Sequence, residues 1–205
     1  IACAPQSQRR TNVTGVLQSW DGLTPNWNPG GLWRTVRMYD TGPVRIDRMR
    51  ALCRDADARR AHVVLAASFD SDAPREAVVV TRRDGAFVDE QTTLATGLND
   101  LEWSVDIRRP ELWWPRELGD QHLTTFAIEV FVDGERSDER QRRLGLRQID
   151  WNDWVFSVNG ERLFLRGTNL TPITEALADT TDALIERDLA HVIDLGLNSV
   201  RVHGH

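Results

Sequence analysis

The sequence predicts a mainly β chain, in which an immunoglobulin-like β-sandwich is followed by a short segment of α/β character. Apolar and polar residues alternate over 101–107 and again over 126–132, as in strands that bury one face. About seven short strands without a helical period fall within roughly a hundred residues, which is typical of such a sandwich. After Gly145 the pattern changes to strand, helix, strand, which indicates a parallel sheet.

The composition is that of an ordinary globular protein and excludes several classes of partner. The chain has 205 residues, of which 40% are hydrophobic and 27% charged, and its net charge is -6. The pI near 5.4 argues against a nucleic-acid-binding face. No apolar run is long enough to span a membrane and no leader segment is visible, so we expect no membrane partner and a cytoplasmic protein.

All 25 basic residues are arginines, and several occur as adjacent pairs. The pairs are far apart in the sequence and are interpreted as solvated surface: Arg9-Arg10, Arg59-Arg60, Arg82-Arg83 and Arg142-Arg143. Cys3 and Cys53 are too few for a disulfide framework, so we expect two free thiols.

The elements can be assigned in order along the chain. Asn28-Pro29-Gly30-Gly31 predicts a turn, followed by a strand-like run from Leu32 to Tyr39. Asp133-Gly134 predicts a hairpin turn, and the charged stretch Glu135–Arg143 after it predicts an exposed edge strand. The remaining predicted strands of the sandwich contain Val44, Ile46 and Met49, His62–Phe69, Ala77–Thr81, Leu101–Ile107 and Phe126–Val132.

The C-terminal segment contains a predicted hairpin and a predicted βα unit. Asn159-Gly160 joins Val155–Val158 to Arg162–Arg166 by a two-residue turn. Thr181 or Asp182 caps a helix that ends at Gly196, and Leu197–His203 is interpreted as a buried strand. One apolar face of this helix carries Leu184, Ile185, Leu189, Val192 and Ile193. A single unit of this kind cannot bury both faces of its strands, so we expect the chain to stop inside a domain.

Short motifs in a fixed order resemble one enzyme family. Residues 28–34 read NPGGLWR, residues 112–115 LWWP, residues 156–169 FSVNGERLFLRGTN and residues 195–201 LGLNSVR. In this order they resemble the end of the sugar-binding jelly-roll domain, the sandwich domain and the start of the catalytic barrel of glycoside hydrolase family 2. The high tryptophan content of the chain, with 8 Trp, favours the β-mannosidase-like branch of this family.

The resemblance implies three parts and an activity. Residues 1–39 would be a jelly-roll remnant, residues 40–146 the sandwich and residues 147–205 the start of an incomplete TIM barrel. The family hydrolyses β-glycosides with retention, using two glutamates and no cofactor. Because those glutamates lie on later barrel strands, no residue here is assigned as catalytic. The expected function is therefore part of an exo-acting β-glycosidase whose partner is a carbohydrate, and the isolated chain is expected to be inactive.

Three residues are candidate substrate contacts. Arg201 matches an arginine near the family's sugar pocket; the alternative is a structural ion pair. Asn169 ends the presumed first barrel strand, where the alternative is a turn residue, and Leu170 replaces a Trp found in many relatives. Asp21, beside Trp20, resembles a jelly-roll loop that reaches the active site; the alternative is local aromatic packing.

Two other functions remain open from the residues alone. The His203-Gly204-His205 pair on a strand resembles zinc-hydrolase ligands, but two ligands are too few and no metal is predicted. Glu175 and Asp179 are interpreted as solvated loop residues. A stand-alone carbohydrate-binding or interaction module with an immunoglobulin-like core is the second alternative, and the βα unit after Asp182 argues against it.

Overall fold

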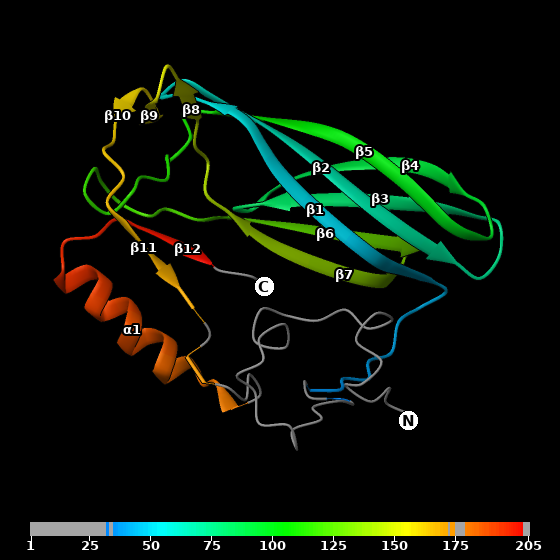
Figure 1. Cartoon of the computed structure of the whole chain (residues 1–205). Helices are drawn as coiled ribbons and strands as arrows, with labels where there is room; N and C mark the ends of the chain where they lie inside the picture. Colours follow the sequence, from blue (N-terminus) through cyan, green and yellow to red (C-terminus); the bar gives the residue numbers. More distant parts are fainter. Residues whose placement is uncertain (1–31, 33–34, 172, 175–178, 203–205) are drawn as a thin grey trace. The chain divides into compact units, whose positions relative to one another are not determined.

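The computed structural model describes residues 32, 35–171, 173–174 and 179–202, and it divides the chain into two compact units. One unit is Tyr39–Phe164, and the other contains the described residues before and after it. The mainly β character predicted from the sequence is confirmed (Figure 1). No helix in the described part of the chain is long and apolar enough to cross a membrane.

The first sheet of the larger unit has three antiparallel strands in the order β1-β2-β5. They are β1 (Val44–Ala56), β2 (Arg60–Ser71) and β5 (Gly97–Arg108). The alternation over 101–107 that predicted a strand places Leu101, Trp103, Val105 and Ile107 toward the core.

The second sheet has four antiparallel strands in the order β4-β3-β6-β7. They are β3 (Arg75–Arg83), β4 (Ala86–Leu94), β6 (Thr124–Val132) and β7 (Glu135–Leu144). The predicted Asp133-Gly134 turn joins β6 to β7, with φ of 52° and 82° that suit a two-residue hairpin. The sequence assignment missed β4, which pairs with β3 along its whole length.

The two sheets enclose a single apolar core, as a sandwich requires. Its largest fully buried side chains include Phe69 on β2 and Phe126 on β6. Trp103 on β5 donates a hydrogen bond from Nε1 to Oγ1 of Thr81 on β3, at 3.0 Å, so one polar contact bridges the sheets. Because Thr81 is buried, this bond satisfies a hydroxyl that would otherwise be costly to bury.

Strand β1 does not alternate regularly, because it contains irregularities in its pairing with β2. The register shifts between Ile46 and Arg48, so that Met49 rather than a residue two positions after Ile46 is the next one buried. Val44, Ile46 and Met49 therefore share one face, as predicted, although their spacing changes.

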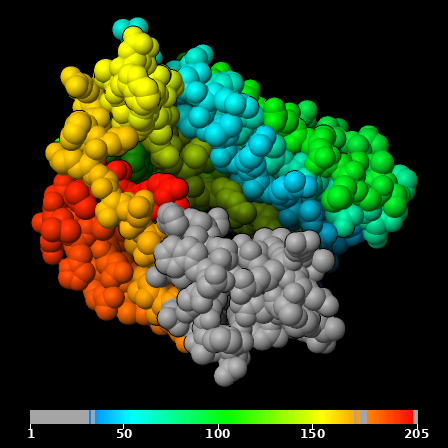
Figure 2. Space-filling view, in the orientation of Figure 1, coloured from blue at the N-terminus to red at the C-terminus, as the bar shows by residue number. Residues whose placement is uncertain are grey.

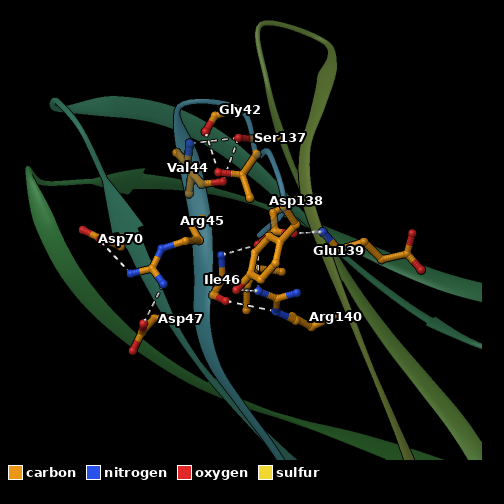
Figure 3. A network of polar contacts seen from close by, with 12 residues as sticks. Gly42, Val44, Arg45, Ile46, Asp47, Asp70, Ser137, Asp138, Glu139 and Arg140 are labelled. Carbon is orange, nitrogen blue, oxygen red and sulfur yellow. Dashed lines mark hydrogen bonds and ion pairs between the residues drawn. The ribbon is translucent and has the colours of Figure 1, made fainter. Parts of the chain in front are cut away.

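The edge strand β7 is in contact with β1 of the other sheet (Figure 3). Ser137 Oγ accepts from Val44 N at 2.8 Å and donates to Val44 O at 2.7 Å. Asp138 Oδ2 accepts from Ile46 N at 2.8 Å, and Gly42 N donates to Ser137 O at 2.7 Å. The prediction of an exposed edge strand was therefore wrong at Ser137, which is 7% exposed because it satisfies the backbone of β1.

The surface view follows the same arrangement. In Figure 2 the cyan atoms of β1 run along the sandwich above the olive atoms of β7. Side chains of β7 thus satisfy backbone groups of the first residues of β1 in place of a paired strand. These contacts protect one edge of the sandwich from pairing with another chain.

Three short strands follow the sandwich within the same unit, in the order β10-β9-β8. They are β8 (Ile149–Asn152), β9 (Val155–Val158) and β10 (Glu161–Arg162). The hairpin at Asn159-Gly160 is confirmed, but its second strand is only two residues long and does not extend to Arg166. Strand β8 was missed because it is short and wholly exposed, with no one-sided apolar pattern to detect.

In the smaller unit, β11 (Gly167–Leu170), α1 (Asp182–Asp194) and β12 (Ser199–Val202) form a βαβ unit with parallel strands. The helix begins after the predicted cap Thr181, whose Oγ1 accepts from Leu184 N. It ends at the predicted Gly196, with φ of 69°, where Gly196 N and Leu197 N donate to Ile193 O and Val192 O.

Two predicted strands differ from the structure, one in its burial and the other in its secondary structure. Strand β12 is exposed rather than buried along most of its length, because only β11 pairs with it among the described residues and α1 buries none of its own. The strand expected over Leu32–Tyr39 is wrong for residues 35–39, which are irregular and exposed. An apolar-rich pattern forms a strand only where a partner accepts its backbone hydrogen bonds.

Candidate functional site

The candidate site lies at the C-terminal ends of β11 and β12, where two of the three predicted contacts meet. Asn169 is on β11 and Arg201 is on β12, and the parallel register places them opposite each other. Asp21 lies outside the described residues. In parallel α/β sheets, ligands bind beyond the carboxyl ends of the strands, which is the edge that these two side chains occupy.

Arg201 and Asn169 are in direct contact. Arg201 Nη1 donates a hydrogen bond to Asn169 Oδ1 at 3.3 Å. Both residues are exposed, and no carboxylate among the described residues lies within ion-pair distance of Arg201. A guanidinium has five N–H donors, so this single bond to an amide orients the group and leaves donors available for hydroxyl or carboxylate oxygens.

A close approach of the two strands sets their register. A side chain at Gly167 would collide with Ser199 Oγ and would approach Ser199 O at 3.2 Å. Gly167 therefore allows β11 to pack directly against β12. Two residues later on each strand, the same register brings Asn169 to Arg201.

The loop that leads into β12 is tied to the residue that leads into β11. Asn198 Oδ1 accepts from Arg166 N at 2.8 Å, and Asn198 N donates to Arg166 O at 2.9 Å. Arg166 Nε also donates to Gly196 O at 3.0 Å, at the end of α1. The helix end and both strand starts are therefore joined, and this connection was missed because a single Asn before a strand carries no distinctive pattern.

The described residues at this edge show no cluster of metal-ligating side chains. They contain no group of three or more His, Cys, Asp or Glu that could hold an ion. His203, His205 and Glu175 lie outside the described part, and Asp179 is exposed. What the site can do chemically is donate hydrogen bonds from Arg201 and from the amide of Asn169.

The chain is similar to known glycosidases in sequence. The family model for glycosyl hydrolases family 2 matches residues 44–147. An exo-beta-D-glucosaminidase of Arthroderma benhamiae is 27% identical over 221 residues, covering 100% of this chain and 25% of that protein. A beta-mannosidase of Rattus norvegicus is 25% identical, covering 98% of this chain and 26% of that protein.

Solved structures resemble the fold. The crystal structure of the Amycolatopsis orientalis exo-chitosanase matches with a TM-score of 0.72 and 26% identity, covering 80% of this chain and 20% of that one. The beta-D-mannosidase of Dictyoglomus thermophilum matches with a TM-score of 0.71 at 21% identity, covering 78% of this chain and 21% of that one. The chain spans about a quarter of the length of the curated relatives that it matches.

Proposed function

The chain belongs to glycosyl hydrolases family 2, and on that premise we propose that it is one segment of a larger, retaining, exo-acting β-glycosidase. The relatives named above are glycosidases of which this segment corresponds to about a quarter. The proposed substrate is the non-reducing end of a β-linked glycoside, with β-mannosides and β-glucosaminides as the first candidates because the relatives' names specify them.

We propose that the segment contains parts of three domains. Residues 1–39 are the end of a jelly-roll domain, residues 40–146 the supporting sandwich and residues 147–205 the start of a (β/α)8 barrel. The position of β1–β7 between Val44 and Leu144 supports the second part, and the parallel βαβ unit supports the third. In such a barrel the active site lies at the C-terminal ends of the strands.

The observation that carries the proposal is the contact between Arg201 and Asn169 at that edge. With β11 and β12 as the first two barrel strands, these side chains bind hydroxyl groups of the sugar at the cleavage point, and Asp21 adds a carboxylate acceptor. Arg201 orients the substrate by donating hydrogen bonds to it. The acid and the nucleophile are two glutamates of the parent protein outside this segment.

A direct test uses the full-length protein encoded by the gene that contains this sequence. Its hydrolysis of 4-nitrophenyl β-mannoside, β-glucosaminide and β-galactoside is followed by NMR, which records the anomeric configuration of the first product. We expect one β-glycoside to be hydrolysed with retention. Inversion, or no hydrolysis of any β-glycoside by a folded full-length protein, would overturn the proposal.

A further inference from the structure

The structure brings together two arginine pairs that are separated by about fifty residues of sequence. Arg59 directly precedes β2, which begins at Arg60, and Arg109 directly follows β5, which ends at Arg108. Arg60 lies directly opposite Arg108 in the antiparallel register, and Arg109 N donates to Arg59 O at 2.8 Å. Four guanidinium groups therefore start from adjacent backbone positions at one end of the sandwich, the end that also carries β8–β10 (Figure 1).

Only one of these four arginines, Arg60, forms an ion pair with a carboxylate among the described residues. Arg60 pairs with Asp55 at 3.1 Å, but Arg59, Arg108 and Arg109 have no carboxylate within 4.0 Å in the described part of the chain. Like charges placed opposite each other in a sheet are unfavourable. The chain has 31 acidic and 25 basic residues. Even so, three arginines of this cluster have no ion-pair partner in the part of the chain that the structure describes.

A second acid beside the pair at the start of β2 is Asp57, and its carboxylate is hydrogen-bonded to the backbone of that pair. Asp57 Oδ1 accepts from the backbone N–H groups of Arg59 at 2.7 Å and Arg60 at 2.8 Å. These backbone bonds hold the pKa of Asp57 below its usual value, so the group stays ionised and fixes the turn. The side chain of Arg59 is left without an ion pair among the described residues.

All four arginines line one surface cavity of about 850 Å³. Its lining also includes the apolar and aromatic residues Pro110, Leu112 and Trp114. The cavity thus combines cationic donors with an indole ring. This is the pairing that suits a sugar ring with an apolar face and an anionic substituent.

Hydrogen bonds within 114–121 fix the segment that carries Trp114. Trp114 N donates to Asp120 O at 2.8 Å, and Gln121 Nε2 donates to Gly119 O at 2.6 Å. A Cβ at Gly119 would lie 3.1 Å from Trp114 Cγ and Cδ1, so the loop packs closely against the ring because it has glycine there. A side chain that is ordered before binding loses little entropy when a ligand arrives.

Arg109 is itself held in an uncommon backbone conformation, with φ of 50°. A non-glycine residue in the left-handed region is strained, and such residues gather at ligand sites. The hydrogen bond from Arg109 N to Arg59 O maintains this conformation and keeps the two arginine pairs together.

We propose that this cavity binds an anionic sugar, a pyranose that carries a carboxylate or a phosphate, between the arginines Arg59, Arg108 and Arg109 and the ring of Trp114. The oxyanion accepts hydrogen bonds from the guanidinium groups, in the two-pronged geometry that arginine provides. The apolar face of the pyranose packs on the indole. The inference does not depend on the proposed hydrolysis, because it concerns binding by the sandwich unit.

Isothermal titration calorimetry of the full-length protein that contains this segment tests it at low salt, where exposed charges are least screened. The ligands are glucuronate and glucose 6-phosphate, with glucose and inorganic phosphate as controls. Binding by either anionic sugar supports the proposal, and the one that binds better identifies the anionic group. We expect the Kd of glucose, which lacks the anion, to be at least about tenfold higher, since each charged hydrogen bond contributes strongly.

Matched variants separate the site from general charge. The double variant Arg108→Gln/Arg109→Gln should raise the Kd about tenfold or more, whereas Arg142→Gln/Arg143→Gln removes the same charge from the exposed face of β7 and should not change it. Trp114→Leu should raise the Kd about threefold or more, and Trp114→Phe should keep most of the affinity. Circular dichroism checks that each variant is folded.

Three outcomes would overturn the proposal. The first is no binding of either anionic sugar, and the second is an equal loss of affinity in both double-arginine variants. The third is binding of inorganic phosphate as tight as that of the sugars and independent of Trp114, which would reduce the cavity to a simple ion patch.

Discussion

Arg201 on β12 donates a hydrogen bond from Nη1 to Oδ1 of Asn169 on β11, 3.3 Å away. The two residues are 32 positions apart and meet because a helix returns the chain to a parallel neighbour of its first strand. The contact joins two side chains at the strand edge where barrel enzymes bind their substrates.

Substituting Arg201 should impair the full-length enzyme. We expect Arg201→Ala to lower kcat/KM by roughly 10- to 150-fold, since loss of a charged hydrogen bond to substrate costs about 1.5–3 kcal/mol. Arg201→Lys should recover only part of this, because an ammonium lacks the planar donor array. Steady-state kinetics measure both, with Arg187→Ala on the exposed surface of α1 as the control. Activity that is unchanged in Arg201→Ala would remove this residue from the site.

The close approach at Gly167 should be sensitive to a single methyl group. Gly167→Ala places a Cβ against Ser199 Oγ, so we expect it to destabilise the βαβ unit by about 1–3 kcal/mol. Ser199→Ala removes the colliding oxygen, and the double variant should recover part of the loss. A double-mutant cycle measured by chemical denaturation gives the coupling, and strictly additive effects would contradict the proposed clash.

The bond between Trp103 and Thr81 should contribute to the stability of the sandwich. Trp103→Phe removes the donor while keeping an aromatic ring, and Thr81→Val removes the acceptor. We expect each to cost about 1–2 kcal/mol in free energy of unfolding, with a coupling near 1 kcal/mol between them. Urea denaturation of both single variants and the double variant is the measurement. A coupling near zero would show that the bond does not stabilise the fold.

Ser137 should matter more than other strand serines. Ser137→Ala removes the hydroxyl that accepts from Val44 N and donates to Val44 O, and it leaves both backbone groups buried without that partner. We expect a loss of about 2 kcal/mol, because unsatisfied buried groups cost about 1–3 kcal/mol. Ser104→Ala, on the exposed face of β5, should change stability little. Equal effects of the two substitutions in thermal unfolding would contradict the role of Ser137.

Cys53 should be an unreactive thiol at neutral pH. Burial raises the pKa of the Cys53 thiol, although the backbone of Arg147 partly opposes the shift. As pH rises past about 8.5, the unfolded thiol ionises before the folded one, so stability should fall there, and Cys53→Ala should abolish this decline. Alkylation followed by mass spectrometry, in a Cys3→Ser background, measures the reactivity. Rapid labelling at pH 7 would contradict a raised pKa.

The sequence predicted the strands that carry a clear apolar pattern. Strands β5 and β6 were recognised because apolar and polar residues alternate along them, and β2 was recognised as a compact apolar run. Strand β4 was missed because most of its residues are exposed and polar, so only the turn at Asp84-Gly85 marks it. A strand that forms the edge of a sheet gains its backbone hydrogen bonds from its neighbour, and this requirement leaves little trace in the choice of side chains.

The site at Asn169 and Arg201 could be predicted from the sequence, whereas the arginine cluster at the start of β2 could not. Asn169 and Arg201 could be placed together because a βα unit followed by a strand predicts a parallel neighbour and a shared edge. The arginine cluster could not be predicted, because it depends on the register of β2 against β5, which brings Arg60 opposite Arg108. Adjacent arginine pairs are ordinary surface features until a nonlocal pairing places two of them side by side.

The most direct test of the central claim is a crystal structure of the full-length protein with a sugar bound in its active site. The account predicts that Arg201 and Asn169 lie within about 3.2 Å of oxygen atoms of the sugar at the non-reducing end. A bound sugar that contacts neither residue, at a site away from the ends of β11 and β12, would contradict it.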